Sequence, residues 1–240
     1  MSLPQVSVTR YVTPLREGGS LPGIVEGDDL GTYVCKFRGA GQGLKVLVAE
    51  VIVAGLAEAL DLPTPRLVEL SLSADIARYE ADEEVQDLLT ASVGSNLGVD
   101  FLPGSFGFDR ADSVPPEVAA KVRWLDGYVA NIDRTWRNPN LLMWHSDLWL
   151  IDHGAALYFH HSWGQTPPGP ERFATAPFDS TGHVFAGADV GGVDRACGDA
   201  LTDEVLAAIV ARVPAAWTSH QDAYVDHLIA RRDGGRPWLS

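Results

Sequence analysis

The segment of residues 131–154 limits the possible folds of this chain more than any other. It opens with a polar stretch that contains Asp133 and, five positions later, Asn138. Two short hydrophobic runs within residues 141–151 then predict a β-hairpin, whose second strand would bring Asp152 back beside Asn138. An ordinary turn followed by a hairpin would give the same pattern, because Asp and Asn are common in loops.

The three polar residues match the needs of phosphoryl transfer. One carboxylate orients the acceptor hydroxyl, while an amide oxygen and a second carboxylate hold Mg²⁺ on the nucleotide phosphates. We therefore predict that Asp133 is the catalytic carboxylate and that Asn138 and Asp152 are metal ligands.

The amino-terminal half contains two further residues that a kinase requires. Lys36 lies within the β-branched and aromatic run 32–37, and Glu50 lies early in a predicted helix over 47–60. A lysine that grips the phosphates and a glutamate that fixes this lysine occupy such positions. Taken singly, Lys36 also fits an edge-strand lysine with an exposed ammonium, and Glu50 fits an acid near a helix amino terminus.

Two glycine-rich stretches flank the lysine strand. Residues 17–23 lie between predicted strands at 10–15 and 24–37, where small residues would let backbone N–H groups approach phosphate. Residues 38–45 follow the lysine strand and either close over the nucleotide or form a flexible connector. The residues that we predict to approach phosphate are Gly18, Gly19, Ser20, Arg38 and Lys45.

Several of these motifs, taken together, resemble the HipA-like kinases, bacterial relatives of the phosphatidylinositol kinases with a protein-kinase-like fold. The resemblance covers roughly residues 10–165 and is carried by Lys36, A-E at 49–50, L-D-L-P-T-P at 60–65, N-I-D-R-T-W-R-N at 131–138 and L-I-D-H-G at 150–154. It implies an ATP- and Mg²⁺-dependent phosphotransferase with an unknown hydroxyl-bearing acceptor, protein or small molecule. It also assigns Lys36 to the nucleotide, with Glu50 as its ion-pair partner.

Some positions depart from the family pattern. Thr135 stands where the family often has histidine, and Asn140, not Asn138, directly precedes the hydrophobic strand, so either asparagine is a candidate metal ligand. The chain is also shorter than the HipA toxins and lacks room for their additional amino-terminal domain. A nucleotide-binding pseudokinase that acts as a regulatory or scaffold module is therefore the alternative function.

The expected architecture is an α+β, two-lobed, protein-kinase-like fold. Residues 1–102 would form an amino-terminal antiparallel sheet with one helix, and residues 103–240 a mostly helical lobe with the catalytic and metal-binding loops. A strand over 97–102 would lead into the hinge between the lobes, so we predict that Phe101 and Leu102 contact the adenine.

Other patterns locate the remaining helices. Acidic residues at its start predict a helix over 83–92. Pro115-Pro116 predicts the start of a helix over 117–132, which would deliver Asp133 at its end. Residues 202–212 and 220–232 have amphipathic helical patterns, whereas the proline- and glycine-rich residues 165–177 predict irregular structure.

Composition excludes several classes of function. The net charge of −14 and the pI near 4.7 argue against binding to nucleic acid or to an anionic membrane surface. Two cysteines give neither a disulfide framework nor metal-ligand spacing. Without a leader pattern or a run of 18 apolar residues, the chain is expected to be cytoplasmic.

Two alternative metal sites remain open. The adjacent His160 and His161 could bind a metal, although a substrate loop is the preferred interpretation of this segment. A metal-dependent hydrolase would instead use the set Asp133, Asp147, Asp152 and His153. That function does not explain Lys36 and Glu50.

Overall fold

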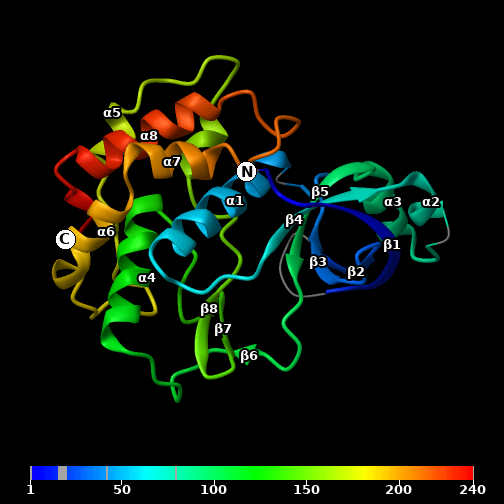
Figure 1. The fold of residues 1–240 in the computed structure, drawn as a ribbon, viewed down its shortest axis with the longest axis horizontal. Coiled ribbons are helices and arrows are strands. Elements are labelled where there is room, and N and C mark those ends of the chain that lie inside the picture. Colours follow the sequence, from blue (N-terminus) through cyan, green and yellow to red (C-terminus); the bar gives the residue numbers. More distant parts are fainter. Residues whose placement is uncertain (1, 16–20, 42, 79, 240) are drawn as a thin grey trace.

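The computed structural model describes residues 2–15, 21–41, 43–78 and 80–239. Their helices and strands confirm the predicted α+β class. A β-barrel built from amino-terminal residues lies beside a larger helical body that carries a small sheet (Figure 1). The division at 102/103 stays a prediction, and one helix from residues 1–102 packs into the helical body.

The amino-terminal strands form a closed barrel. They are β1 (Gln5–Pro14), β2 (Gly23–Gly27), β3 (Thr32–Lys36), β4 (Leu67–Leu72) and β5 (Gly94–Asp100). Their order is β1-β2-β3-β5-β4, and β4 pairs in parallel with β1 whereas the other pairs are antiparallel. The predicted antiparallel sheet is corrected accordingly, since closure through one parallel pair removes the two exposed edges.

The single strand expected over 24–37 is also corrected, because it consists of β2, a tight turn and β3. In this turn Asp29 Oδ1 accepts a hydrogen bond from the Gly31 N–H at 3.0 Å. Leu30 adopts a left-handed conformation with a φ of 66°. The polar residues and glycine of this turn separate two short strands that each alternate between buried and partly exposed residues.

Helix α1 (Leu44–Ala59) connects the two parts of the molecule. Its residues 47–57 are all buried, as expected for a helix that is hydrophobic on every side. It packs against α7 (Asp203–Val210) and α4 (Pro116–Val129) of the helical body, although it follows the barrel strand β3 in sequence. A movement of the barrel relative to the helical body would therefore displace residues of α1.

Two shorter helices cover the barrel. One of them confirms the helix predicted over 83–92, and together with α1 they show that a single helix within residues 1–102 is too few. Helices α2 (Ala74–Arg78) and α3 (Glu83–Ala91) place Ala77, Val85 and Leu89 in the barrel core. The Asp82 carboxylate accepts hydrogen bonds from two backbone N–H groups at the start of α3.

The helical body contains a three-stranded sheet in the order β6-β7-β8. Strands β7 (Leu141–Trp144) and β8 (Asp147–Leu150) form the predicted hairpin, and β6 (Phe106–Gly107) pairs with β7. The turn residues His145 and Ser146 have φ values of 50° and 70°. Positive values at both positions match the twist that a two-residue hairpin requires.

The other elements of the body differ in part from the expected pattern. Helices α7 and α8 (Gln221–Asp233) confirm two predictions, and α4 ends at Val129 because Ala130 turns left-handed with a φ of 54°. Helix α6 (Gly191–Ala200) was not predicted, because its three glycines disfavour a helix, and α5 (Glu171–Ala174) interrupts the expected irregular stretch. The 3₁₀ turns are η1 (Tyr158–Ser162) and η2 (Pro237–Leu239).

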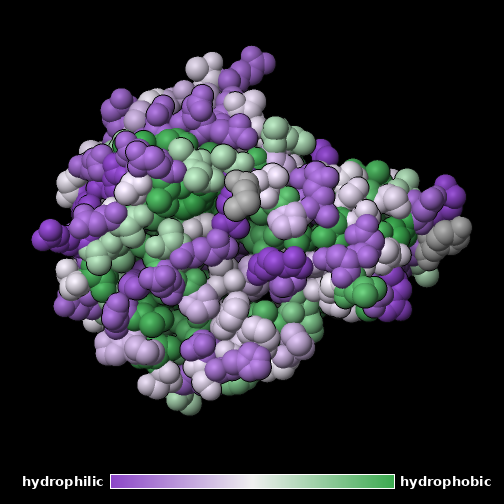
Figure 2. All heavy atoms as spheres, viewed as in Figure 1, coloured by the Kyte–Doolittle hydropathy of each residue, from purple (hydrophilic) through white to green (hydrophobic). Residues whose placement is uncertain are grey.

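Hydrophilic residues cover much of the face shown in Figure 2, with hydrophobic patches between them on the helical body. None of the helices in the described ranges combines the length and hydrophobicity that a bilayer crossing requires.

Candidate active site

β3 and α1 bring Lys36 and Glu50 into direct contact. Lys36 lies on a strand that pairs with β2 on one side and β5 on the other, so its backbone is fixed. Its ammonium donates a hydrogen bond to Glu50 Oε1. The two side chains are 15% and 3% exposed, so water and salt screen this ion pair only weakly.

Asp152 joins this ion pair from the far end of the chain. It follows β8, and its backbone is left-handed with a φ of 53°. Lys36 Nζ lies 2.7 Å from Asp152 Oδ1, so one ammonium contacts two carboxylates. The Asp152 side chain is 53% exposed, which leaves this side of the cluster accessible to a ligand.

Gly154 allows α1 to approach the segment that carries Asp152. A Cβ atom at position 154 would lie 2.5 Å from Val46 Cγ1 and 3.2 Å from Glu50 Oε1. The first distance is too short for any side chain without displacement of Val46. The glycine of L-I-D-H-G therefore serves a close approach between the segment after β8 and the helix of Glu50.

Asp133, Asn138 and Asn140 form a second cluster in the loop after α4. Asp133 Oδ2 accepts hydrogen bonds from Asn138 Nδ2 at 2.8 Å and from Asn140 Nδ2 at 3.3 Å. Asn140 Nδ2 also lies 3.3 Å from the Asp152 backbone carbonyl, so it connects the two clusters. Asn138 is exposed, whereas Asn140 is only 8% exposed.

Burial and neighbouring charges set the protonation of the first cluster. Burial disfavours the charged form of Lys36, but Glu50 and Asp152 outweigh it and raise the pKa of the ammonium. Burial raises the pKa of Glu50, against the opposing effect of Lys36. Burial would also raise the pKa of Asp152, but Lys36 brings it below the usual value. A cation therefore lies beside a half-exposed anion at neutral pH.

The structure does not bring all of the predicted phosphate contacts to this cluster. Gly18, Gly19 and Ser20 lie outside the described residues. The backbone N–H of Arg38 donates to Asn96 Oδ1 at 2.9 Å, which anchors the start of the second glycine stretch. Lys45 points to the helical body, where its ammonium donates to the carbonyls of His160 at 2.6 Å, His161 at 3.3 Å and Trp163 at 3.1 Å. Its three donors are thus used within the protein, which argues against a phosphate contact.

The predicted hinge residues lie between the barrel and the helical body. Phe101 is 45% exposed, and its N–H donates to the Thr32 carbonyl at 3.0 Å. Leu102 is buried, and its carbonyl accepts hydrogen bonds from the N–H and hydroxyl of Ser105. These backbone groups already have partners, so the predicted adenine contacts stay a prediction.

The alternative metal sites do not assemble. Asp147 lies at the turn end of β8, whereas Asp152 follows the other end of that strand. His160 is buried, and its Nδ1 lies 3.0 Å from the Tyr224 hydroxyl. Across the described ranges, no three His, Cys, Asp or Glu side chains group in a manner that could hold a metal ion. A metal at Asp152 would therefore need amide oxygens or phosphate as further ligands.

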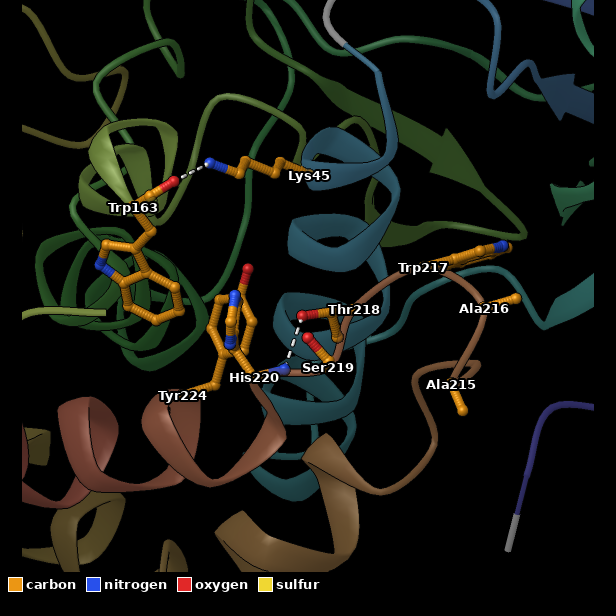
Figure 3. A pocket seen from close by; sticks show the side chains of 9 residues that line it. All are labelled: Lys45, Trp163, Ala215, Ala216, Trp217, Thr218, Ser219, His220 and Tyr224. Carbon is orange, nitrogen blue, oxygen red and sulfur yellow. Dashed lines mark hydrogen bonds between the residues drawn. The ribbon is translucent and has the colours of Figure 1, made fainter. Parts of the chain in front are cut away.

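A separate cavity of about 380 Å³ lies beside the start of α1 (Figure 3). Lys45, Trp163 and Tyr224 line it together with residues 215–220. None of the residues of the two clusters lines this cavity. Lys45 points across one side of this cavity toward Trp163, as its hydrogen bonds require.

A buried polar network beneath the loop was not predicted from the sequence. Arg134 and Asp126 are fully buried, and Arg134 Nε donates to Asp126 Oδ2 at 2.6 Å. His183 Nε2 lies 2.9 Å from the same oxygen. An aspartate within the apolar run 124–129 of a helix was the signal available in the sequence, because a buried carboxylate requires partners.

Comparison with known proteins identifies the family. The chain has no significant match among curated proteins. Two similar solved structures are the Golgi casein kinase with Mn/ADP bound, at a TM-score of 0.49 and 10% identity over 99% of this chain and 74% of that chain, and the Golgi casein kinase, at 0.45 and 10% over 98% and 75%. A sequence model of the HipA-like kinases matches residues 8–166, which confirms the resemblance. The chain belongs to the HipA-like kinase family.

Proposed function

We propose that this protein is an ATP- and Mg²⁺-dependent phosphotransferase that transfers the γ-phosphate to a hydroxyl acceptor. The observation that carries the proposal is the contact of the largely buried Lys36 with both Glu50 and Asp152, while Asn140 connects Asp152 to Asp133. This arrangement combines a cation for phosphate, oxygen ligands for a metal and a separate carboxylate for the acceptor.

Lys36 would bind the nucleotide phosphates. Its ammonium is held by Glu50 on one side, which fixes its position before any ligand arrives. Because most of its side chain is shielded from water, its attraction to phosphate would be stronger than that of a surface lysine.

Asp152 and Asn138 would hold the metal. The carboxylate and amide oxygens are hard donors of the kind that Mg²⁺ prefers, and Mg²⁺ on phosphates needs few protein ligands. Asn138 donates its Nδ2 to Asp133, which leaves its amide oxygen for a cation on the exposed side. When bound, Mg²⁺ would neutralise charge on the phosphates. The buried Asn140 would hold the loop against the Asp152 backbone.

Asp133 would accept the proton of the acceptor hydroxyl. Its Oδ2 receives two amide hydrogen bonds, which orient the carboxylate and leave Oδ1 for the acceptor. A group in this position acts on the acceptor and makes little contact with the nucleotide.

The test compares wild type with Asp133→Asn. Transfer of label from γ-labelled ATP, or hydrolysis of ATP where no acceptor is known, should fall by roughly two to four orders of magnitude. The affinity for ATP, measured by calorimetry with Mg²⁺, should stay close to that of wild type. Full activity in the variant would refute the assignment of Asp133. A wild-type protein that binds ATP without any turnover would instead establish the pseudokinase alternative.

A further inference from the structure

Arg134 contacts both the loop that carries Asp133 and the segment that carries Asp152. It follows Asp133 directly, and its Nη1 donates to the carbonyls of Pro139 at 3.3 Å and Asn140 at 2.5 Å. Its Nη2 lies 3.4 Å from Nδ1 of His153, the neighbour of Asp152. A rotation of this guanidinium would therefore move the loop of Asp133 and the segment of Asp152 relative to each other.

Asp126 fixes the orientation of Arg134. Its Oδ2 accepts from Arg134 Nε and its Oδ1 from Asn131 Nδ2 at 2.9 Å. Burial alone would raise the pKa of this carboxyl group, but Arg134 and His183 lower it to about 2, so the carboxylate stays charged. A buried carboxylate of this kind requires all of its hydrogen-bond donors.

His183 supplies one of these donors from a distant segment. Its Nδ1 accepts a hydrogen bond from the Phe185 N–H at 3.0 Å, so the ring proton resides on Nε2 and points to Asp126. The backbone of the same segment is also attached to the loop, because the Val184 N–H donates to the Arg134 carbonyl at 3.2 Å. His183 lies beyond residues 8–166, the part that matches the family.

We propose that His183 is a positioning residue for the phosphotransfer, acting through Asp126 and Arg134 on the loop that carries Asp133. The proposal rests on the proposed function, since it concerns the geometry of the same site. Without the Nε2 donor, Asp126 Oδ2 would depend on Arg134 alone, and the guanidinium would shift toward it and away from the Asn140 carbonyl and His153. Small displacements of reacting groups have large effects on rate and smaller effects on nucleotide affinity.

The experiment compares His183→Phe with His183→Gln in the 240-residue chain. Phenylalanine keeps the ring and removes the donor, whereas the amide nitrogen of glutamine lies the same number of bonds from Cα as Nε2. His227→Phe is the matched control, because His227 is equally buried but its Nδ1 contacts a carbonyl of its own helix, that of Ala223. The measurements are kcat and KM for Mg²⁺-dependent ATP turnover and the Kd for ATP by calorimetry.

We expect His183→Phe to lower kcat by about ten- to hundredfold, the usual effect of losing a group that orients a catalytic residue, with the Kd for ATP changed by less than about threefold. His183→Gln should recover most of kcat, and His227→Phe should retain the wild-type value. Unchanged kcat in His183→Phe, or an equal loss in His183→Gln and His183→Phe, would overturn the positioning role.

Failure of the proposed function would give a different result. A wild-type chain that neither binds nor turns over ATP would overturn both proposals. If it binds ATP without turnover, the Mg²⁺ dependence of that binding becomes the readout. His183→Phe should then raise about tenfold the Mg²⁺ concentration that ATP binding requires, with recovery in His183→Gln, because Asp152 is held through His153 and Arg134. The Kd for ATP at saturating Mg²⁺ should stay within about threefold of the wild-type value. Equal Mg²⁺ dependence in all three proteins would overturn the role of His183 while leaving nucleotide binding intact.

Discussion

Lys36 carries one positive charge between two carboxylates of different exposure, and this asymmetry determines what the site can do. The Glu50 carboxylate is buried and holds the lysine in place, whereas Asp152 is half-exposed and free to bind a ligand on its other side. A phosphate group with a bound cation would complement both, since Lys36 would face the anion and Asp152 the metal.

Substitution of Lys36 distinguishes its two expected roles, which are to bind phosphate and to neutralise the buried Glu50. Lys36→Met should weaken ATP binding and destabilise the apo protein by about 3–5 kcal/mol, because Glu50 would be left buried without its cation. The double variant Lys36→Met, Glu50→Leu should regain most of this stability, since it removes both charges, yet it should still bind ATP poorly. Chemical denaturation and calorimetry measure the two effects. ATP affinity that returns with stability would show that Lys36 does not contact phosphate.

The two asparagines near Asp133 are expected to differ in their effects. Asn138→Ala should raise the Mg²⁺ concentration needed for ATP to stabilise the protein against heat, with little change in the stability of the apo protein, because Asn138 is exposed. Asn140→Ala should lower apo stability by about 1–3 kcal/mol, because it removes the buried link to the Asp152 carbonyl. Thermal melts with and without Mg²⁺-ATP distinguish them. The reverse pattern would make Asn140 the metal ligand.

At the level of elements, the close approach of α1 to the segment after β8 determines the distance between Glu50 and Asp152. Gly154→Ala should cost about 1–3 kcal/mol of stability, because its methyl group would collide with Val46, and should also weaken ATP binding. The double variant with Val46→Ala should restore both, since it removes the obstructing methyl groups. Gly164→Ala, where no atom lies within 4 Å of the added Cβ, serves as the control. Normal stability and ATP affinity in Gly154→Ala would show that this contact is not needed.

Elements with local signals could be predicted from the sequence, whereas those that depend on distant partners could not. The β7–β8 hairpin and the helix leading to Asp133 have periodic hydrophobic residues and recognisable boundaries. The parallel pairing of β1 with β4 joins residues 64 positions apart, such as Gln5 and Glu69, so no turn pattern in the sequence indicates it. Helix α6 was missed because tertiary packing of Val193 and Cys197 overrides the low helix propensity of its glycines.

Across the whole molecule, the candidate site residues were easier to predict from the sequence than the residues that support them. Lys36, Glu50, Asp133 and Asp152 belong to short motifs that a sequence displays directly. The support of Arg134 comes from Asp126 in a helix and from His183, which lies 57 residues from Asp126 in sequence. Contacts of this kind arise only when the helical body has assembled.

Acid should destabilise the fold through its buried neutral histidines. Burial lowers the pKa of His153 and of His160 to about 3, from the ordinary value near 6.5. Because the unfolded chain binds protons on these rings below about pH 6.5 and the folded chain does not, stability is highest above that pH and falls as the pH decreases toward 3. Each histidine should contribute a loss of about 2 kcal/mol between pH 7 and pH 5, and the slope approaches about 1.4 kcal/mol per pH unit only well below pH 6.5.

Denaturant unfolding between pH 7 and pH 5 measures this slope. His160→Phe should lose about 2 kcal/mol less stability than wild type between pH 7 and pH 5, even though the variant starts from a different stability, because it removes one titrating ring. Asp126 affects the stability of the fold only at lower pH. Its pKa of about 2 lies below the ordinary carboxylate value, so its contribution is complete above about pH 4 and is lost as the pH falls through 2. Asp126→Asn should therefore leave the slope between pH 7 and pH 5 unchanged, and the same slope in wild type and His160→Phe would contradict the assignment of the acid sensitivity to His160.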